Sequence, residues 1–330
     1  MPSNISVFVP HNGCPNMCSF CNQFSITSHI SQPDERDVDD AVMTAVRTMG
    51  AGCAQSEIAF FGGSFTAIKR DYMLSLLKAA YKYVADGTVR GIRLSTRPDA
   101  IDEEILGVLA QYGVTTVELG AQSMSDNVLV ANRRGHTAQD VRDTSEMIKR
   151  YGFALGLQMM TGLYADNDEG AVNTCREFIA LSPDCVRIYP TVVLRGTLLA
   201  DYYRDGKYKP QTVEQAVELC SKLLCMFRSA DIPVIRLGLH SIEQSDYVAG
   251  PWHPAFGELC ESRIFLKKIK DMTERGKSYL IRVSPRNVSK AVGHGRANIS
   301  ALADEDIHIK VTADESYDDI RITAEVVRAN

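Results

Sequence analysis

The sequence predicts an α/β fold, a partial (β/α)6 TIM-like barrel followed by a small α/β segment. Short runs of β-branched and aromatic residues alternate with amphipathic helical patterns, which is typical of βα units around a parallel sheet. Polar or glycine-rich residues follow six successive predicted strands. A chain of 330 residues has room for such a barrel and an additional segment.

The six barrel strands are predicted at residues 5–9, 58–61, 91–95, 116–119, 155–160 and 186–189, with a seventh strand at 234–239. Helices are predicted at residues 38–49, 72–85, 101–112, 138–151, 169–181 and 213–230. Thr137 is suited to cap the helix that follows it. Cys220 and Cys225 fall in the apolar pattern of the last helix, so we expect both thiols to be buried.

The composition is that of a soluble globular protein, with 45% hydrophobic and 23% charged residues. No stretch of 18 apolar residues occurs, and the residues after Met1 lack the basic and apolar regions of a signal peptide. We therefore expect no membrane association and a cytoplasmic location. Nine cysteines without an export signal fit a reducing compartment.

Three cysteines, Cys14, Cys18 and Cys21, follow the first predicted strand with the spacing C-x3-C-x2-C. Three thiolates can hold a [4Fe-4S] cluster and leave its fourth iron without a protein ligand. A zinc site needs four donors, and a c-type haem needs C-x-x-C-H, whereas Asn22 stands at the histidine position. The spacing resembles the signature of radical S-adenosylmethionine (SAM) enzymes, and this resemblance implies a [4Fe-4S] cluster and SAM as cofactors.

Candidate SAM-binding residues follow the later strands. In a parallel barrel the loops after the strands converge on one face, so these residues are expected to lie close together. Taken singly, each has an ordinary explanation: glycines that form a turn, or polar side chains that bond their own loop. Beside the cysteines they could contact one nucleoside, and Arg134 or its neighbour Arg133 could pair with a carboxylate. The candidates are Gly62, Gly63, Ser64, Ser95, Gln122, Arg134 and Thr161.

Several longer strings together resemble the radical SAM part of the Elongator catalytic-subunit-like family over roughly residues 5–265. They are the cysteine motif with Asn22-Gln23, Phe60-Phe61-Gly62-Gly63-Ser64-Phe65-Thr66, Ser95-Thr96-Arg97-Pro98-Asp99, Glu118-Leu119-Gly120-Ala121-Gln122-Ser123, Asn132-Arg133-Arg134-Gly135-His136 and the Gly-Pro-Trp-His-Pro string from Gly250 to Arg263.

The resemblance implies cleavage of SAM to a 5′-deoxyadenosyl radical for modification of the tRNA wobble uridine. It also implies an electron donor such as flavodoxin or ferredoxin. We expect these 330 residues to lack the acetyltransferase domain and the basic N-terminal extension of full-length Elongator-type enzymes, which leaves open whether acetyl-CoA or another co-substrate is used.

The domain boundary is predicted after residue 262, with the barrel and its extension at 1–262 and a small basic segment at 263–330. From Arg263 to Arg296 there are ten basic and two acidic residues, a local charge of +8 in a chain of net charge -5. The predicted order is a strand (279–283), a helix (285–292), the loop Gly293-His294-Gly295-Arg296, a helix (297–303) and two strands (307–311, 320–326).

This order is similar to a KH-type RNA-binding fold, although Arg296 replaces the second glycine of a G-x-x-G loop. A small cap that shields the end of the barrel is the alternative. The positive charge favours RNA, and we expect tRNA to contact residues 263–296.

Two other functions stay open. Coproporphyrinogen-oxidase-like radical SAM enzymes share a related Gly-x-Gln-Ser motif, so the substrate could be a tetrapyrrole or another small molecule. Alternatively, the chain could be a non-catalytic Fe-S protein that binds RNA. His253 and Glu258 are candidates for proton transfer or for lining the substrate entrance, with a purely structural role equally open.

Overall fold

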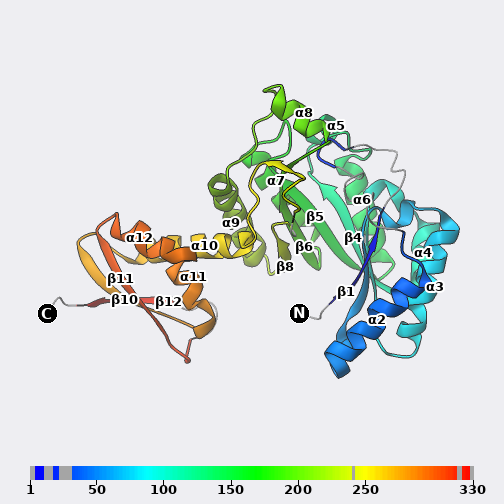
Figure 1. Ribbon diagram of the computed structural model, residues 1–330, viewed down its shortest axis with the longest axis horizontal. Coiled ribbons are helices and arrows are strands. Elements are labelled where there is room, and N and C mark those ends of the chain that lie inside the picture. The colour runs from blue at the N-terminus through cyan, green and yellow to red at the C-terminus, as the bar shows by residue number, and fades with distance from the viewer. Residues whose placement is uncertain (1–3, 11–17, 22–31, 240–241, 318–321, 328–330) are drawn as a thin grey trace.

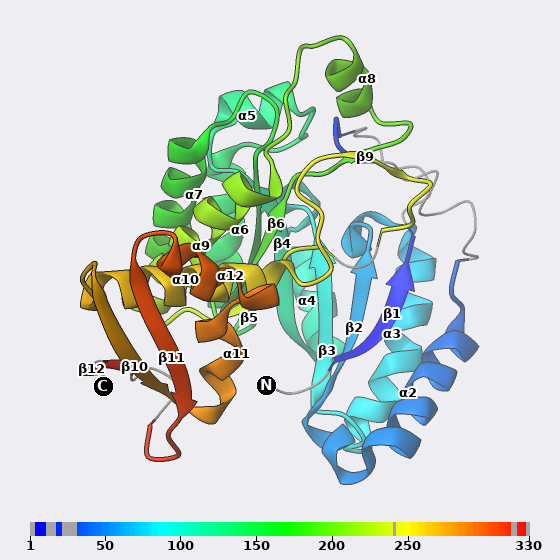
Figure 2. The same cartoon turned by 60° about the vertical axis from the view of Figure 1, so that its left-hand side comes forward.

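The computed structural model describes residues 4–10, 18–21, 32–239, 242–317 and 322–327. A curled sheet of seven parallel strands forms the larger part of the molecule, as Figures 1 and 2 show. Its strands follow the order β1-β2-β3-β4-β5-β6-β8. They are β1 (Asn4–Val9), β2 (Glu57–Gly62), β3 (Gly91–Thr96), β4 (Val114–Gln122), β5 (Ala154–Thr161), β6 (Cys185–Pro190) and β8 (Val234–Leu237).

All seven predicted strands are present, and the fold class, a partial parallel barrel, is confirmed. The seventh strand ends at Leu237 rather than at residue 239. Apolar side chains alternate along the strands and meet the helices in one large core, which includes Ile58, Leu94, Val117 and Leu157. The hydrophobic effect of burying this face holds the sheet against its helices.

Six helices follow barrel strands and pack on the outside of the curl, namely α2 (Glu35–Met49), α3 (Arg70–Ala85), α4 (Glu103–Gln111), α6 (Ala138–Arg150), α7 (Asp168–Leu181) and α9 (Val213–Ser229). Thr137 caps α6 as predicted, because its side chain accepts a hydrogen bond from the Asp140 N–H. Cys220 is buried in α9, but the prediction for Cys225 was wrong: this thiol is exposed, because α9 turns it away from the buried side formed by Leu224 and Phe227.

Several short elements lie outside this regular repeat. They are α5 (Asp126–Ala131), β7 (Val193–Leu194), α8 (Leu198–Arg204), β9 (Tyr247–Ala249) and the 3-10 turns η1 (Gly50–Gln55), η2 (Phe65–Ala67) and η3 (Pro98–Ala100). β7 pairs with β9 in a separate two-stranded sheet. Figures 1 and 2 place α5 and α8 at the same end of the barrel.

The C-terminal part has its own three-stranded sheet, ordered β11-β10-β12. Its elements are β10 (Lys277–Val283), η4 (Pro285–Asn287), α11 (Val288–Val292), η5 (His294–Arg296), α12 (Ala297–Ala303), β11 (Ile307–Ala313) and β12 (Ile322–Val327). β10 runs parallel to β11 and antiparallel to β12. The predicted strand-helix-helix-strand-strand order is therefore present.

Helix α10 (Phe256–Met272) joins the two parts and crosses residue 262. Phe256 and Cys260 belong to the barrel core, whereas Phe265 and Ile269 belong to a second core with the C-terminal sheet. A domain boundary after residue 262 stays a prediction. None of the helices in the described part of the chain is long and apolar enough to span a membrane.

Candidate functional site

A cavity of about 510 Å³ opens where the barrel strands end, and both β1 and β8, the two outer strands of the sheet, contribute to its lining. Of the predicted site residues, Cys18, Cys21, Gly62, Gly63, Ser64, Ser95, Gln122 and Arg134 line it. Residues separated by more than 100 positions in the sequence thus meet in one place. Cys14 lies outside the described residues, and Thr161 is not part of the lining.

The two described cysteines of the motif border the cavity on a short turn. The Cys21 N–H donates to the Cys18 carbonyl at 3.1 Å. Cys18 is 7% exposed, and its Sγ lies 3.2 Å from Nη1 of Arg134. The Arg134 guanidinium therefore contacts a sulfur of the cysteine motif directly.

The glycine loop after β2 lies close to β1. Gly62 has a φ of +115°, and a Cβ added there would lie 2.5 Å from the ring of Phe8. The Gly63 N–H donates to the Val9 carbonyl at 3.0 Å, which joins the ends of β1 and β2. Ser64 is buried, and its Oγ accepts from the Arg97 N–H at 3.0 Å. The loop needs glycine at position 62 because both backbone and space exclude a side chain.

Gln122 reaches the cavity through a distortion of β4. The pairing of β4 with β5 shifts between Gly120 and Gln122, and Gln122 has a φ of +67°. A positive φ is unfavourable for a residue with a side chain, and such backbones cluster at functional sites. Among the residues that the structure describes, none forms a hydrogen bond with the buried Oε1 of Gln122.

Arg134 is directed toward the cavity by the end of α5. Arg133 has a φ of +55°, and the Arg134 N–H donates to the Leu129 carbonyl at 2.9 Å. This left-handed turn leaves Arg133 exposed. The Arg134 guanidinium donates to the Gly120 carbonyl at 2.7 Å, while its buried Nε has no partner in the described part of the chain. Of the two arginines that the sequence left as alternatives, Arg134 lines the cavity and Arg133 does not.

Thr161 is fully buried beside Cys220, with 3.8 Å between Oγ1 and Sγ. Its side chain is not brought to the cavity, so a contact with SAM stays a prediction without geometric support. His253 and Glu258 also lie outside the lining. The ring of His253 packs edge-on against His294 of the C-terminal part, with 5.5 Å between ring centroids.

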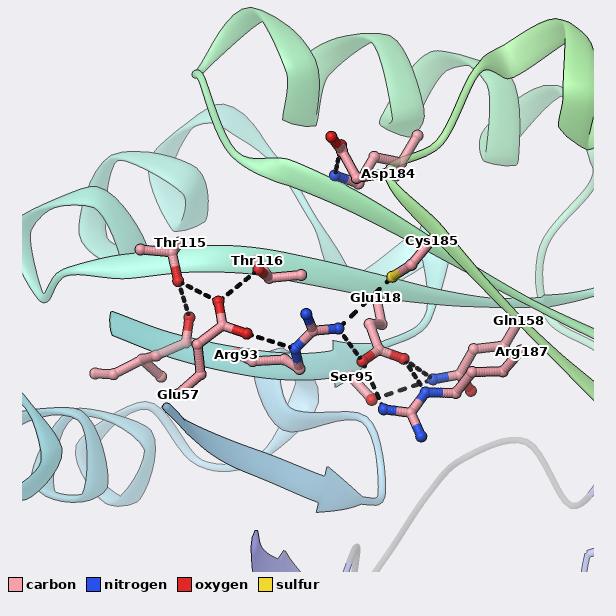
Figure 3. Close-up of polar contacts among 12 residues, drawn as sticks. Glu57, Arg93, Ser95, Thr115, Thr116, Glu118, Gln158, Asp184, Cys185 and Arg187 are labelled. Carbon is pink, nitrogen blue, oxygen red and sulfur yellow. Dashed lines mark hydrogen bonds and ion pairs between the residues drawn. The ribbon is translucent and has the colours of Figure 1, made fainter. Parts of the chain in front are cut away.

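A network of buried charges crosses the barrel interior below these residues, as Figure 3 shows. Glu118 accepts from Arg93 at 2.8 Å, from Arg187 at 2.5 and 2.9 Å, and from Gln158 at 2.9 Å. Glu57 accepts from Arg93 at 2.9 Å, and the amide of Gln158 also donates to Ser95 at 3.2 Å. Arg93, Glu118, Gln158 and Arg187 all line the cavity.

Both carboxylates of this network are held ionised. Burial alone would raise the pKa of Glu118, but hydrogen bonds and positive charge from Arg187 and Arg93 lower it below its ordinary value. Burial would likewise raise the pKa of Glu57, and hydrogen bonds from Thr115 and Thr116 together with the charge of Arg93 lower it. Neither carboxylate is placed to donate a proton at neutral pH.

Sequence reasoning missed this network, although its signal is present. Polar residues alternate with apolar ones along β3, β5 and β6, as in Gly91-Ile-Arg-Leu-Ser95, and alternate residues of a strand share one face. The same face of β8 carries Arg236, which is paired in register with Arg187. The alternation therefore marks the interior face of the barrel.

Arg236 resembles Arg134 and differs from Arg93, Arg97 and Arg187, because its guanidinium donates to backbone carbonyls, those of Gly238 and Leu239. Arg93 and Arg187 pair with Glu118, and Arg97 pairs with Asp99. Within the described part of the chain, Arg236 forms no ion pair with a carboxylate. It leaves positive charge in the cavity at the outer strand of the sheet.

The basic stretch of the C-terminal part is partly neutralised. Arg263 pairs with Glu214 and Glu218, Lys270 with Glu305, Lys277 with Glu274 and Arg282 with Glu325. Lys267, Lys268, Lys290 and Arg296 make no such pair with the residues that the structure describes. Fewer charges than the sequence count of +8 are thus available to a partner.

Fold and site together define an α/β partial barrel whose strand ends carry a cysteine motif, a glycine loop and a polar cavity. The family model of the radical SAM superfamily matches residues 8–178, and that of the Radical_SAM C-terminal domain matches residues 183–265. The chain therefore belongs to the radical SAM superfamily, a family of enzymes that use a [4Fe-4S] cluster and SAM.

Similar proteins support the predicted resemblance. The chain is 25% identical over 230 residues to the tRNA uridine(34) acetyltransferase of Dehalococcoides mccartyi, covering 60% of this chain and 50% of the relative. It is 30% identical over 201 residues to human Elongator complex protein 3, covering 55% and 37%. The chain thus spans half or less of these relatives.

A solved structure shares the fold. Elp3 from the archaeon Methanocaldococcus infernus, lacking N-terminal residues 1–46, superposes with a TM-score of 0.65 at 21% identity and covers 84% of this chain and 65% of the other. The likeness to Elongator-type proteins that the sequence motifs predicted is confirmed.

The described residues fit the cofactors of the family. Two cysteines and the exposed Gly62 line the cavity, and buried polar atoms of Gln122 and Arg134 have no partner among the residues that the structure describes. Unpartnered buried polar atoms are unfavourable unless a ligand satisfies them. When bound, a [4Fe-4S] cluster and SAM supply the radical chemistry; Cys18 and Cys21 would hold the cluster, and Gln122 and Arg134 would contact SAM.

Proposed function

We propose that this protein is a radical SAM enzyme that cleaves SAM to a 5′-deoxyadenosyl radical and modifies the wobble uridine of tRNA. The observation that carries the choice of substrate is the similarity to proteins named tRNA uridine(34) acetyltransferase and Elongator complex protein 3. In this proposal Cys14, Cys18 and Cys21 ligate the cluster. Gly62, Gly63, Ser64, Ser95, Gln122 and Arg134 contact SAM, and flavodoxin or ferredoxin supplies the electron in the cytoplasm.

A nucleotide substrate agrees with the charge of the cavity. Arg236 has no carboxylate partner among the described residues, and it lies beside Arg187 on neighbouring strands. Arg187 already pairs with Glu118, so Arg236 is the cation of this pair that an anion of the substrate can neutralise. In the proposed complex Arg236 donates hydrogen bonds to a phosphate of the substrate RNA.

The C-terminal part, residues 263–330, is proposed to bind the RNA outside the cavity. Gly293, Gly295 and Arg296 have φ values of +83°, +57° and +66°, and a Cβ at Gly293 would lie 2.7 Å from the Asn298 nitrogen. This tight loop exposes Arg296 at the end of the two-helix motif. The contact of His294 with His253 joins the loop to the Gly-Pro-Trp-His-Pro string that begins at Gly250.

Mass spectrometry of tRNA nucleosides tests the substrate. We expect a strain that lacks the protein to lose one modified form of the wobble uridine, and purified protein with SAM and reductant to restore it. An unchanged nucleoside profile together with no tRNA binding would contradict the tRNA assignment. It would favour a tetrapyrrole or another small molecule as substrate.

Binding measurements test the two proposed RNA contacts separately. We expect Arg236→Met to weaken tRNA binding and to lower the slope of log K against log salt by about one, because one phosphate contact is lost. The double variant Lys290→Ala/Arg296→Ala should lower this slope by about two, because two phosphate contacts are lost. Arg176→Met, which removes an exposed arginine paired with Glu169, is the matched control. Slopes equal to the control in both variants would contradict these contacts.

A further inference from the structure

Ser19 lies between two cysteines of the motif and is bound to distant parts of the chain through all of its polar groups. Its N–H donates to the Asn132 carbonyl at 3.1 Å, and its Oγ donates to Oδ1 of Asn132 at 2.7 Å. Its carbonyl accepts from the Leu199 N–H at 2.7 Å. Ser19 is 0% exposed. A loop residue on which three long-range hydrogen bonds converge has little freedom to move.

Asn132 is the centre of this arrangement. It is also 0% exposed, and its side-chain amide donates to the carbonyls of Val128 and Tyr164, both at 2.8 Å. The same side chain therefore connects the end of α5, the loop after β5 and the cysteine loop. Its oxygen and its amide nitrogen are both used, so an isosteric leucine would remove the partner of the Ser19 hydroxyl and of the Tyr164 carbonyl, while the backbone bonds of residue 132 would remain.

The residue after Ser19 is held by apolar contacts. Phe20 packs with Tyr164 and Tyr202 on a small core of Val193, Leu199 and Tyr208 that is separate from the main core. This core is built from β7, α8 and the neighbouring loops, which are the elements outside the regular βα repeat. Leu199 contributes both its N–H to Ser19 and its side chain to this core.

We infer that Ser19 and Asn132 are positioning residues that hold Cys18 and Cys21 in the geometry required of cluster ligands. The inference rests on the proposed assignment of these cysteines as ligands. Ser19 is adjacent to Cys18 and two residues from Cys21, so fixing its backbone fixes the directions of both thiols. Groups around metal ligands that orient them increase the affinity for the metal, since less freedom is lost on binding.

The function of the elements inserted around β7 and α8 follows from this inference. The βα repeat alone places the cysteine loop at the end of β1, but it offers no partner for the Ser19 carbonyl. The Leu199 N–H lies in the first turn of α8, where backbone donors have no partner within the helix. The Ser19 carbonyl satisfies this donor, so α8 and the cysteine loop stabilise each other.

The test compares Ser19→Ala and Asn132→Ala with Ser221→Ala. Ser221 is a buried serine in α9 whose hydroxyl bonds the carbonyls of Val217 and Cys260, and it does not line the cavity. Each protein is reconstituted anaerobically with iron and sulfide. The readouts are the rate of iron release to a chelator, the electron paramagnetic resonance spectrum of the reduced cluster and the melting temperature of the apoprotein.

We expect Ser19→Ala to release iron about fivefold faster than the wild type, which corresponds to a net hydrogen bond of about 1 kcal/mol, with an altered spectrum. Asn132→Ala should release iron faster still. Ser221→Ala should retain the wild-type rate and spectrum, even where its melting temperature falls as much as that of Ser19→Ala.

Wild-type rates and spectra in both Ser19→Ala and Asn132→Ala would overturn the positioning role while leaving the cluster assignment intact. A wild-type protein that takes up no cluster would overturn the ligand assignment and the inference together. The assay contains no tRNA, so its outcome is independent of the proposed substrate.

Discussion

Glu118→Gln is expected to destabilise the protein by about 3 kcal/mol. Removing one partner of a buried ion pair costs about 3–5 kcal/mol, because the remaining charge is left buried without compensation. The Glu118 side chain is 1% exposed, whereas Arg93 and Arg187 are 12% and 19% exposed. Arg93 keeps its pair with Glu57 in the variant, so the loss falls mainly on Arg187 and the lower end of the range applies.

The assay is equilibrium unfolding of the apoprotein in urea at pH 7, with Glu104→Gln as control. Glu104 pairs with Arg70 on the surface and is 80% exposed, so its substitution should cost less than about 1 kcal/mol. The slope of the free energy against urea must match among the proteins for the comparison to hold. Equal losses in Glu118→Gln and Glu104→Gln would refute the view that the barrel interior is held by a charge network.

Two further predictions concern His136 and Gly62. Burial, with the charge of Arg134, lowers the pKa of His136 to about 4 from 6.5. The unfolded chain therefore binds the proton first, and stability that is complete above pH 6.5 should fall by up to about 3 kcal/mol as the pH drops toward 4. His136→Gln should flatten this dependence in urea unfolding between pH 7 and 4, and an unchanged profile would contradict the assignment. Gly62→Ala should destabilise the protein by at least about 1 kcal/mol and weaken SAM binding in calorimetry, since φ is positive and Phe8 blocks the new methyl group. Gly107→Ala, in the open middle of α4, should instead stabilise the protein by up to about 1 kcal/mol. A change in unfolding free energy of the same sign in Gly62→Ala and Gly107→Ala would contradict the strain assigned to the loop at Gly62.

The barrel was predictable because its seven parallel strands and the six helices packed outside them each carry a local signal. The runs at residues 58–61 and 91–95 are apolar and bounded by turns, and they became β2 and β3 with ends shifted by one residue. Helix α8 and the pair β7 and β9 were missed, because elements of two to seven residues leave no periodicity to read. These are the elements whose stability comes from tertiary contacts.

The candidate site was predictable where a strand ends and the next loop begins. Gly62, Ser95 and Gln122 line one cavity because parallel strands end at the same edge. Thr161 ends a strand in the same way but is buried beside Cys220. The position of a residue along its strand determines at which end of the barrel it lies. Whether its side chain points into the cavity depends on the alternation of side chains along the strand.

Contacts that depend on folding could not be predicted. Ser19 and Asn132 lie in two separate motifs 113 residues apart, and nothing in the sequence indicates that their side chains bond to each other. The count of +8 in residues 263–296 ignored Glu214, Glu218, Glu305 and Glu325, which lie outside that stretch and pair with its arginines and lysines. Charge counts along a sequence overestimate the field of a surface when partners come from other elements.

Formation of 5′-deoxyadenosine tests the central claim most directly. Wild-type protein, reconstituted anaerobically and supplied with SAM and dithionite, should bind a cluster and release 5′-deoxyadenosine and methionine. Cys18→Ala should do neither, while Cys225→Ala, which changes an exposed cysteine outside the motif, should do both. A wild-type protein that binds the cluster and SAM but releases no 5′-deoxyadenosine would contradict the account.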